Sequence, residues 1–354
     1  MQIPLKWINE LVNIETIELN ELIEKLTLGG FEVEEIIEIE INNQKQIALD
    51  ISSTANRSDS LSIQGISMEI ATLLDKPLKL SKYSFTLNQW KKNLECFTGT
   101  LSFEYNCPIF LALTVDNLTN LSVPTWLKEK LISSGITPSN DLLDFQNYIL
   151  LETGYPFAFY DANKISSKLN ISNFQFSISR TQNNQKFFAS NNNYYELDKN
   201  TLLININEIP ISIAGIIENQ EFSCSKSTNS LLIEASIFNP VEIRQQSRAL
   251  GLRTERSARY EKSLKKTYLI ESLYRLVYLL KISNPNLICK LHTINKAEEQ
   301  IPPPILLRYE TINEILGPII GSTKQDLNYI TPDNVLNYLK RLNFKFIYDE
   351  SELT

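Results

Sequence analysis

Strand-like patterns recur along the first two thirds of the chain. Between residues 31 and 41, apolar residues alternate with glutamates, and this period of two predicts a half-buried strand with an acidic outer face. The glutamates could instead bind a metal, but a solvated strand face is the favoured interpretation. Further strands are predicted at residues 47–51, 110–115 and 202–206. Residues 211–217 are nearly all apolar, which predicts a strand buried on both faces.

Helical periodicity alternates with these strands. Apolar residues three or four positions apart predict short helices at 21–28, 61–74, 309–316 and 331–342. We expect Ser58 or Asp59 to cap the helix at 61–74, because either side chain can accept a hydrogen bond from the first helical turn. The longest predicted helix covers residues 255–280.

These patterns predict an α+β, multidomain chain. Three consecutive prolines mark the clearest linker, because the chain before them cannot continue as a helix. A strand-like pattern near the last residue suggests that the final domain is incomplete. The expected units are a small α+β N-terminal domain at 1–80, a mixed α/β central domain at 84–290, a Pro-rich linker at 291–304 and the start of a small α+β domain at 305–354.

Charge and residue counts then exclude several classes of function. The net charge is −7 over 354 residues, so RNA could be a ligand only through local basic patches or a partner's charge. The single histidine, His292, leaves no room for a two-histidine zinc site or a histidine relay, and we interpret it as an ordinary surface or core side chain. Abundant isoleucine and asparagine hint at an AT-rich genome such as that of an organelle.

The four cysteines show no Cys-x-x-Cys spacing, which disfavours a zinc ribbon and a disulfide framework and suggests reduced thiols. The N-terminal residues lack the features of a signal or transit peptide. No apolar run approaches the roughly 20 residues of a membrane span. We therefore expect a protein without a membrane partner.

The search for chemistry finds no glycine-rich phosphate loop and no paired acids at helical spacing, so we expect no catalytic residue and no metal ligand in this chain. The notable feature is a local excess of positive charge. Several of its residues lie three or four apart, and would form one stripe on the predicted long helix. The stripe could contact tRNA phosphates or an acidic partner, or it could be a solvated face paired with nearby glutamates. The stripe consists of Arg256, Arg259, Lys262 and Lys266. The contact candidates in the whole basic region are Arg244, Arg248, Arg253, Arg256 and Arg259, with Glu261 beside them.

The same region resembles a known signature. Residues 250–262, Leu-Gly-Leu-Arg-Thr-Glu-Arg-Ser-Ala-Arg-Tyr-Glu-Lys, are similar to the Gly-Leu-Arg-Thr…Arg-Phe-Glu-Arg-Gly motif of the β subunit of bacterial-type phenylalanyl-tRNA synthetase. Residues 54–62 resemble the family's Thr-Pro-Asn-Arg-Pro-Asp-Cys-Leu-Ser stretch. Other matching segments follow in the family's order, at residues 7–12, 28–34, 124–127, 135–138, 144–148, 234–240 and 312–317.

The resemblance implies the non-catalytic subunit of a class II aminoacyl-tRNA synthetase. In this family the α subunit carries the ATP, phenylalanine and class II catalytic site, and the β subunit supports it, completes an (αβ)₂ heterotetramer and helps to bind tRNA(Phe). The holoenzyme uses ATP and Mg²⁺, and we expect neither to be bound by this chain. Two departures concern the layout. The oligonucleotide-binding insertion is missing, because residues 41–47 join the early strands directly, as in plastid-encoded members. The family's catalytic-like module, its magnesium-binding acids and its anticodon-binding domain are not in this sequence.

A third departure concerns the central domain, which resembles the family's editing domain. Ala158 stands where the family has histidine, and Glu218, Asn219 and Gln220 stand where it has Gly-Gly-Glu. Without the glycine pair, a ligand cannot approach the backbone so closely. With Glu234 and Ala235, these residues form a degenerate editing pocket, and we expect editing of Tyr-tRNA(Phe) to be weak or lost.

Two other hypotheses remain open. The chain could be a hydrolase of mischarged aminoacyl-tRNA, alone or within the complex, or a scaffold remnant with no role in aminoacylation. The composition and the missing insertion favour the plastid stroma as the location, and the bacterial cytoplasm is the alternative.

Overall fold

The computed structural model describes residues 1–54, 56–79, 95–98, 107–119, 121–171, 174–266, 268–296, 303–319, 327–342 and 344–348. The predicted domain boundaries at residues 80 and 84 lie outside these ranges. Residues 297–302 of the predicted linker also lie outside them.

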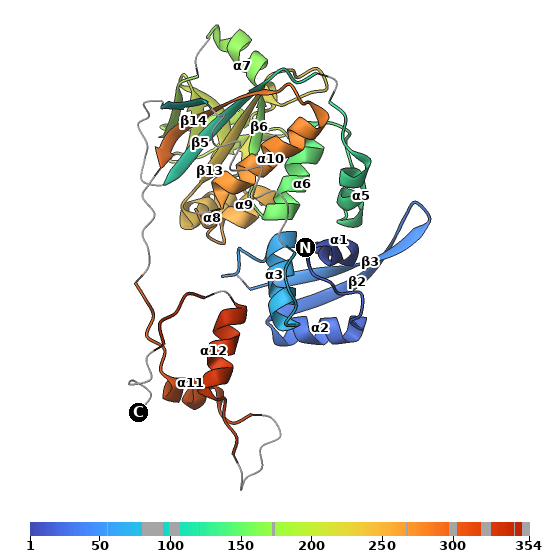
Figure 1. The fold of residues 1–354 in the computed structure, drawn as a ribbon. Helices are drawn as coiled ribbons and strands as arrows, with labels where there is room; N and C mark the ends of the chain where they lie inside the picture. Colours follow the sequence, from blue (N-terminus) through green and yellow to red (C-terminus); the bar gives the residue numbers. More distant parts are fainter. Residues whose placement is uncertain are drawn as a thin grey trace.

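The N-terminal residues form a three-stranded antiparallel sheet in the order β1-β3-β2, covered by helices (Figure 1). Asn42 and Asn43, both with positive φ, form the two-residue turn between β2 and β3. The predicted strands at 31–41 and 47–51 are confirmed. The elements are β1 (Gln2–Pro4), α1 (Leu5–Leu11), α2 (Leu19–Leu28), β2 (Phe31–Ile41), β3 (Gln44–Ser53) and α3 (Ile63–Leu73).

The cap predicted for α3 is wrong. Ser62 caps the helix, because its Oγ accepts a hydrogen bond from the Gly65 N–H at 3.0 Å. Ser58 instead donates its hydroxyl to the carbonyl of Ser263 at 3.0 Å, and Asp59 forms an ion pair with Arg57. Both side chains are thus engaged elsewhere.

The central part is built on two sheets. A five-stranded sheet has the order β4-β14-β5-β13-β6, with β4 parallel to β14 and the other pairs antiparallel. A four-stranded antiparallel sheet has the order β12-β11-β10-β7, and β8 pairs with β9. The strands are β4 (Glu95–Thr98), β5 (Ile109–Asp116), β6 (Ala158–Asp161), β7 (Phe176–Arg180), β8 (Gln185–Phe188), β9 (Tyr194–Leu197), β10 (Leu202–Ile206), β11 (Ile209–Ile213), β12 (Ile217–Glu218), β13 (Leu231–Ile237) and β14 (Ile288–Lys296).

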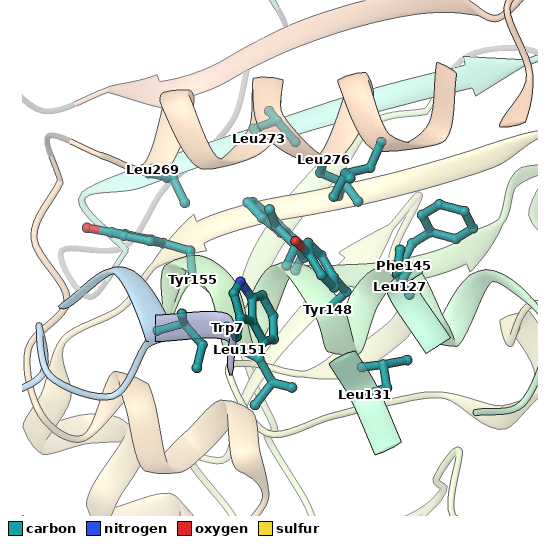
Figure 2. Packing of buried hydrophobic residues seen from close by; sticks show 14 of the residues in the cluster. Trp7, Leu127, Leu131, Phe145, Tyr148, Leu151, Tyr155, Leu269, Leu273 and Leu276 are labelled. Atoms are coloured by element: carbon teal, nitrogen blue, oxygen red, sulfur yellow. The ribbon is translucent and has the colours of Figure 1, made fainter. Parts of the chain in front are cut away.

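Each face of the five-stranded sheet has its own core. Alternate residues of β5 and β13 face helices α6 and α10, and this core continues without a break into the N-terminal elements (Figure 1). Figure 2 shows the junction, where Trp7 of α1 lies against Tyr148 of α6. The other residues of β5 and β13 face the four-stranded sheet. The helices are α5 (Thr125–Ser133), α6 (Leu142–Thr153), α7 (Ala162–Leu169), α8 (Pro240–Ala249), α9 (Glu255–Tyr260) and α10 (Leu269–Ser283), with a 3₁₀ turn η1 (Gln220–Phe222).

The structure contradicts three of the predictions made from the sequence. The predicted helix at 255–280 is two helices, α9 and α10, and Ser263 between them has φ 65°. The apolar run at 211–217 is not one strand, because the chain turns at Gly215 (φ 67°) between β11 and β12. The predicted linker begins too early, because residues 291–296 belong to β14 and pair with β5.

Helices α11 (Tyr309–Leu316) and α12 (Pro332–Arg341) confirm the two short helices predicted near the C-terminus. Thr331 and Asn334 form a capping box at the start of α12. The part of these two helices that the structure describes contains no buried residue. Arg341 connects α12 to the C-terminal end of α3 through the carbonyl of Thr72 and the carboxylate of Asp75.

Candidate functional site

The candidate site centres on Glu234, an acid in the middle of the fully buried strand β13. The residue is 1% exposed, and its cross-strand neighbours are Ala112 on β5 and Ala158 on β6. Because side chains two apart on a strand share a face, Tyr160 and Ser236 point to the same side as Ala158 and Glu234. This side faces the four-stranded sheet.

Polar contacts satisfy the buried Glu234 carboxylate. The Tyr160 hydroxyl donates to Oε2 at 2.7 Å, and the Ser236 hydroxyl donates to Oε1 at 2.8 Å. The Tyr260 hydroxyl in turn reaches the Ser236 carbonyl at 3.1 Å. Burial, reinforced by the charge of Glu234, raises the pKa of Tyr160 well above its ordinary value, so this phenol stays protonated and keeps its donor role.

Arg256 supplies the positive charge. It enters from α9, and its Nη1 donates to Glu218 Oε1 at 2.8 Å while its Nη2 donates to Glu234 Oε1 at 3.2 Å. Burial by itself lowers the pKa of Arg256, but the two carboxylates outweigh burial and the pKa lies above its ordinary value. The guanidinium therefore stays charged and joins β12 of one sheet to β13 of the other.

The remaining editing-pocket candidates have structural contacts. Asn219 caps the η1 turn through its Oδ1, and its Nδ2 donates to the Pro210 carbonyl at 3.1 Å. Gln220 accepts a hydrogen bond from the Ser223 hydroxyl at 3.3 Å. Ala235 packs in the helix-side core, on the opposite face of the sheet from Glu234. The structure thus brings together Ala158, Glu218 and Glu234, and it separates Ala235 from them.

The predicted basic stripe is not one surface. Arg256 and Arg259 are 7% and 3% exposed, and Arg259 is held by the carbonyl and carboxylate of Glu255. Burial lowers the pKa of Arg259. The carboxylate of Glu255 acts in the opposite direction but does not outweigh burial. A solvent-facing stripe through these two arginines is wrong, because both side chains point into the interior from α9, and α9 itself ends at Tyr260.

The outer part of the basic cluster remains on the surface. Arg244 and Arg248 lie one turn apart on α8, and both are exposed. Arg253 is also exposed, and its Nε lies 3.8 Å from the half-buried carboxylate of Glu261. These three exposed arginines are called the outer arginine surface below.

Sequence reasoning missed the polar network around Glu234. Tyr160 and Ser236 follow Ala158 and Glu234 by two residues, and this spacing on strands is the signal that places them together. It also missed a second buried ion pair on the helix side, where Arg275 of α10 donates to Glu152 of α6 at 2.7 Å and 2.8 Å. The described ranges contain no group of three or more His, Cys, Asp or Glu side chains placed to hold a metal ion. None of the helices that the structure describes is long and apolar enough to cross a membrane.

Comparison with known proteins assigns the family. The B3/4 domain model matches residues 106–284. A chloroplastic phenylalanine–tRNA ligase β subunit from Phaeodactylum tricornutum is 59% identical over 353 residues, which cover 100% of this chain and 50% of the relative. A chloroplastic β subunit from Porphyra purpurea is 33% identical, covering 98% of this chain and 47% of the relative.

A β subunit from Prochlorococcus marinus is 34% identical over 82% of this chain and 36% of its own length. A solved N-terminal fragment of the Pyrococcus horikoshii β subunit matches with a TM-score of 0.44 and 12% identity over 99% of this chain and 91% of the fragment, a likeness too weak to carry an argument. The chain spans about half the length of the chloroplastic relatives it matches. It belongs to the B3/4-domain family, together with the β subunits of bacterial-type phenylalanine–tRNA ligase.

Proposed function

We propose that this chain acts as a β subunit of phenylalanine–tRNA ligase and supports a catalytic α subunit in the ATP-dependent charging of tRNA(Phe) with phenylalanine. The observation that carries the proposal is the 59% identity to the Phaeodactylum tricornutum β subunit along the whole chain. The assembly is an (αβ)₂ heterotetramer, with ATP bound by the α subunit and Mg²⁺ required by the holoenzyme. Since the relatives from Phaeodactylum and Porphyra are named chloroplastic, the proposed location is the plastid stroma.

The outer arginine surface is the proposed contact for tRNA(Phe). Arg244 and Arg248 are exposed and one turn apart, so both guanidinium groups can approach neighbouring phosphates. Arg253 extends the same charge beyond the end of α8. Since the chain as a whole is acidic, tRNA binding depends on local charge of this kind.

Editing of Tyr-tRNA(Phe) is proposed to be weak or lost. The supporting observation is the ion pair between Glu218 and Arg256, since Glu218 stands where the resemblance implies a glycine that gives a ligand access to the backbone. A site that distinguishes tyrosine from phenylalanine needs buried polar groups that fit the extra hydroxyl. Here the buried polar groups near Glu234 already bind one another.

Co-expression with the cognate α subunit tests the assembly. Gel filtration followed by charging of tRNA(Phe) should give a complex with phenylalanylation activity. Failure to form a complex would refute the proposed role and favour the scaffold hypothesis.

The same preparation tests editing. Incubation with Tyr-tRNA(Phe) should give deacylation close to the uncatalysed rate. Robust deacylation that is lost in Glu234→Gln would contradict the loss of editing, and deacylation by the chain without α would favour a stand-alone hydrolase.

A further inference from the structure

Two carboxylates from different sheets converge on one guanidinium in the interior. Glu218 ends β12 of the four-stranded sheet, and Glu234 lies in the middle of β13, between β5 and the edge strand β6 of the five-stranded sheet. Their side chains are 14% and 0% exposed, and the side chain of Arg256 between them is 8% exposed. The cluster contains two carboxylates and one guanidinium, so it favours a bound cation.

The cross-strand neighbours of Glu234 leave space for that cation. Ala112 and Ala158 flank Glu234 on both sides, and both are fully buried. A methyl group on each neighbouring strand covers little of the face above the carboxylate, whereas larger side chains at these register positions would pack across it. The ionic contact comes from Arg256, which lies on α9 and belongs to neither sheet. It is separated from Glu234 by 22 residues in the sequence.

The hydrogen bonds around Glu234 are independent of Arg256. Tyr160 and Ser236 donate to the two carboxylate oxygens from strands β6 and β13. Shortening Arg256 therefore removes the cation but leaves the carboxylate oriented. A buried carboxylate without its cation raises the free energy of the folded state. Binding of a small cation of suitable shape would therefore be favourable.

We propose that Glu218 and Glu234 form a cation subsite whose resident occupant is the Arg256 side chain, and that this subsite binds a free guanidinium group when the arginine is shortened. In the native chain the tethered guanidinium keeps such ligands out. The guanidinium Nη atoms already contact one carboxylate each, so the subsite matches two donors spaced as in a planar guanidinium. The inference concerns the same residues as the proposed loss of editing but depends only on their placement.

Binding of ethylguanidinium to Arg256→Ala tests the proposal on the 354-residue chain without α subunit or tRNA. Ethylguanidinium replaces most of the atoms that the substitution removes. We expect a saturable rise in melting temperature at millimolar ligand with Arg256→Ala, and no such rise with the native chain. Ethylurea, a neutral analogue of similar shape, should give at least ten-fold weaker binding, and Glu234→Gln combined with Arg256→Ala should abolish the response.

Three results would overturn the proposal. One is a folded Arg256→Ala variant that does not respond, and another is an equal response to ethylurea, which would indicate simple cavity filling. If Arg256→Ala does not fold alone, refolding with ethylguanidinium should recover folded protein, and failure to recover it is the third. Since neither tRNA nor α subunit is present, these outcomes are separate from failure of the proposed role in charging.

Discussion

Substitution of Trp7 by alanine tests whether the N-terminal elements and the central part share one core. Trp7 is 3% exposed and stacks on Tyr148, with ring centroids 5.0 Å apart and an interplanar angle of 20°. The Nζ of Lys130 lies 4.8 Å from the centroid of the Trp7 ring. Trp7 therefore joins α1 to both α5 and α6 (Figure 2).

The expected loss follows from this packing. Truncating a buried tryptophan to alanine lowers the free energy of unfolding by about 3–5 kcal/mol, because apolar contact is lost and a cavity remains. The stacked pair accounts for about 0.5–1.5 kcal/mol of that loss. Trp126 is a matched control. Its ring contacts the same Tyr148 edge-on, with ring centroids 5.4 Å apart, but the residue is 38% exposed. Trp126→Ala should lower the free energy by about 1–2 kcal/mol, since less of its area is buried.

Urea denaturation followed by far-UV circular dichroism measures both variants. If the core is continuous, Trp7→Ala shifts the transition of the whole N-terminal and central assembly to lower urea. An early transition that releases only the N-terminal helices, with the remaining signal unchanged, would refute the shared core. A loss below about 1 kcal/mol for Trp7→Ala would refute the packing argument itself.

Three further predictions concern charge. Arg275→Leu should lower the free energy of unfolding by about 3–5 kcal/mol in urea denaturation because it leaves the buried Glu152 unpaired, and adding Glu152→Leu should restore part of the loss. Burial, with Lys290 nearby, lowers the pKa of His292 in the folded chain, so the free energy of unfolding should fall as the pH drops below the ordinary value of 6.5. Melting temperatures measured from pH 7.5 to 5.5 should show a smaller fall in His292→Asn. In the assembled complex, Arg244→Glu and Arg248→Glu should each weaken tRNA(Phe) binding, and filter binding should show the slope of log K against log salt reduced by about one. Unchanged slopes would show that these residues do not contact the tRNA.

The strands were the most predictable part of the fold. The alternation at 31–41 corresponds to β2, because one face of that strand packs on the core and the other carries glutamates into solvent. The run at 202–206 corresponds to β10, whose residues are all buried between neighbouring strands. Period alone did not locate the turn at Gly215, since the residues around it are as apolar as those of the strand.

The helix break after Tyr260 depends on contacts that are distant in sequence. Lys262 donates to the carbonyl of Ser53 at 3.2 Å, and the Tyr155 hydroxyl donates to the carbonyl of Lys265 at 2.6 Å. These bonds engage backbone and side-chain groups across the segment where the helix was expected to continue. Apolar periodicity cannot predict this outcome, because tertiary contacts override local helical preference.

The arginines show where prediction of the site stops. Arg244, Arg248 and Arg256 have the same chemistry and similar spacing, yet two lie in solvent and one is buried. The difference is that Arg256 meets two carboxylates 38 and 22 residues away, and only the fold brings these groups together. One part of this arrangement could be predicted from the sequence. The apolar run at 231–237 contains a single acid, Glu234, and if the run is a buried strand that acid needs polar partners. The sequence cannot say which arginine is the cation among its partners, because that choice requires the register of the sheet and the position of α9.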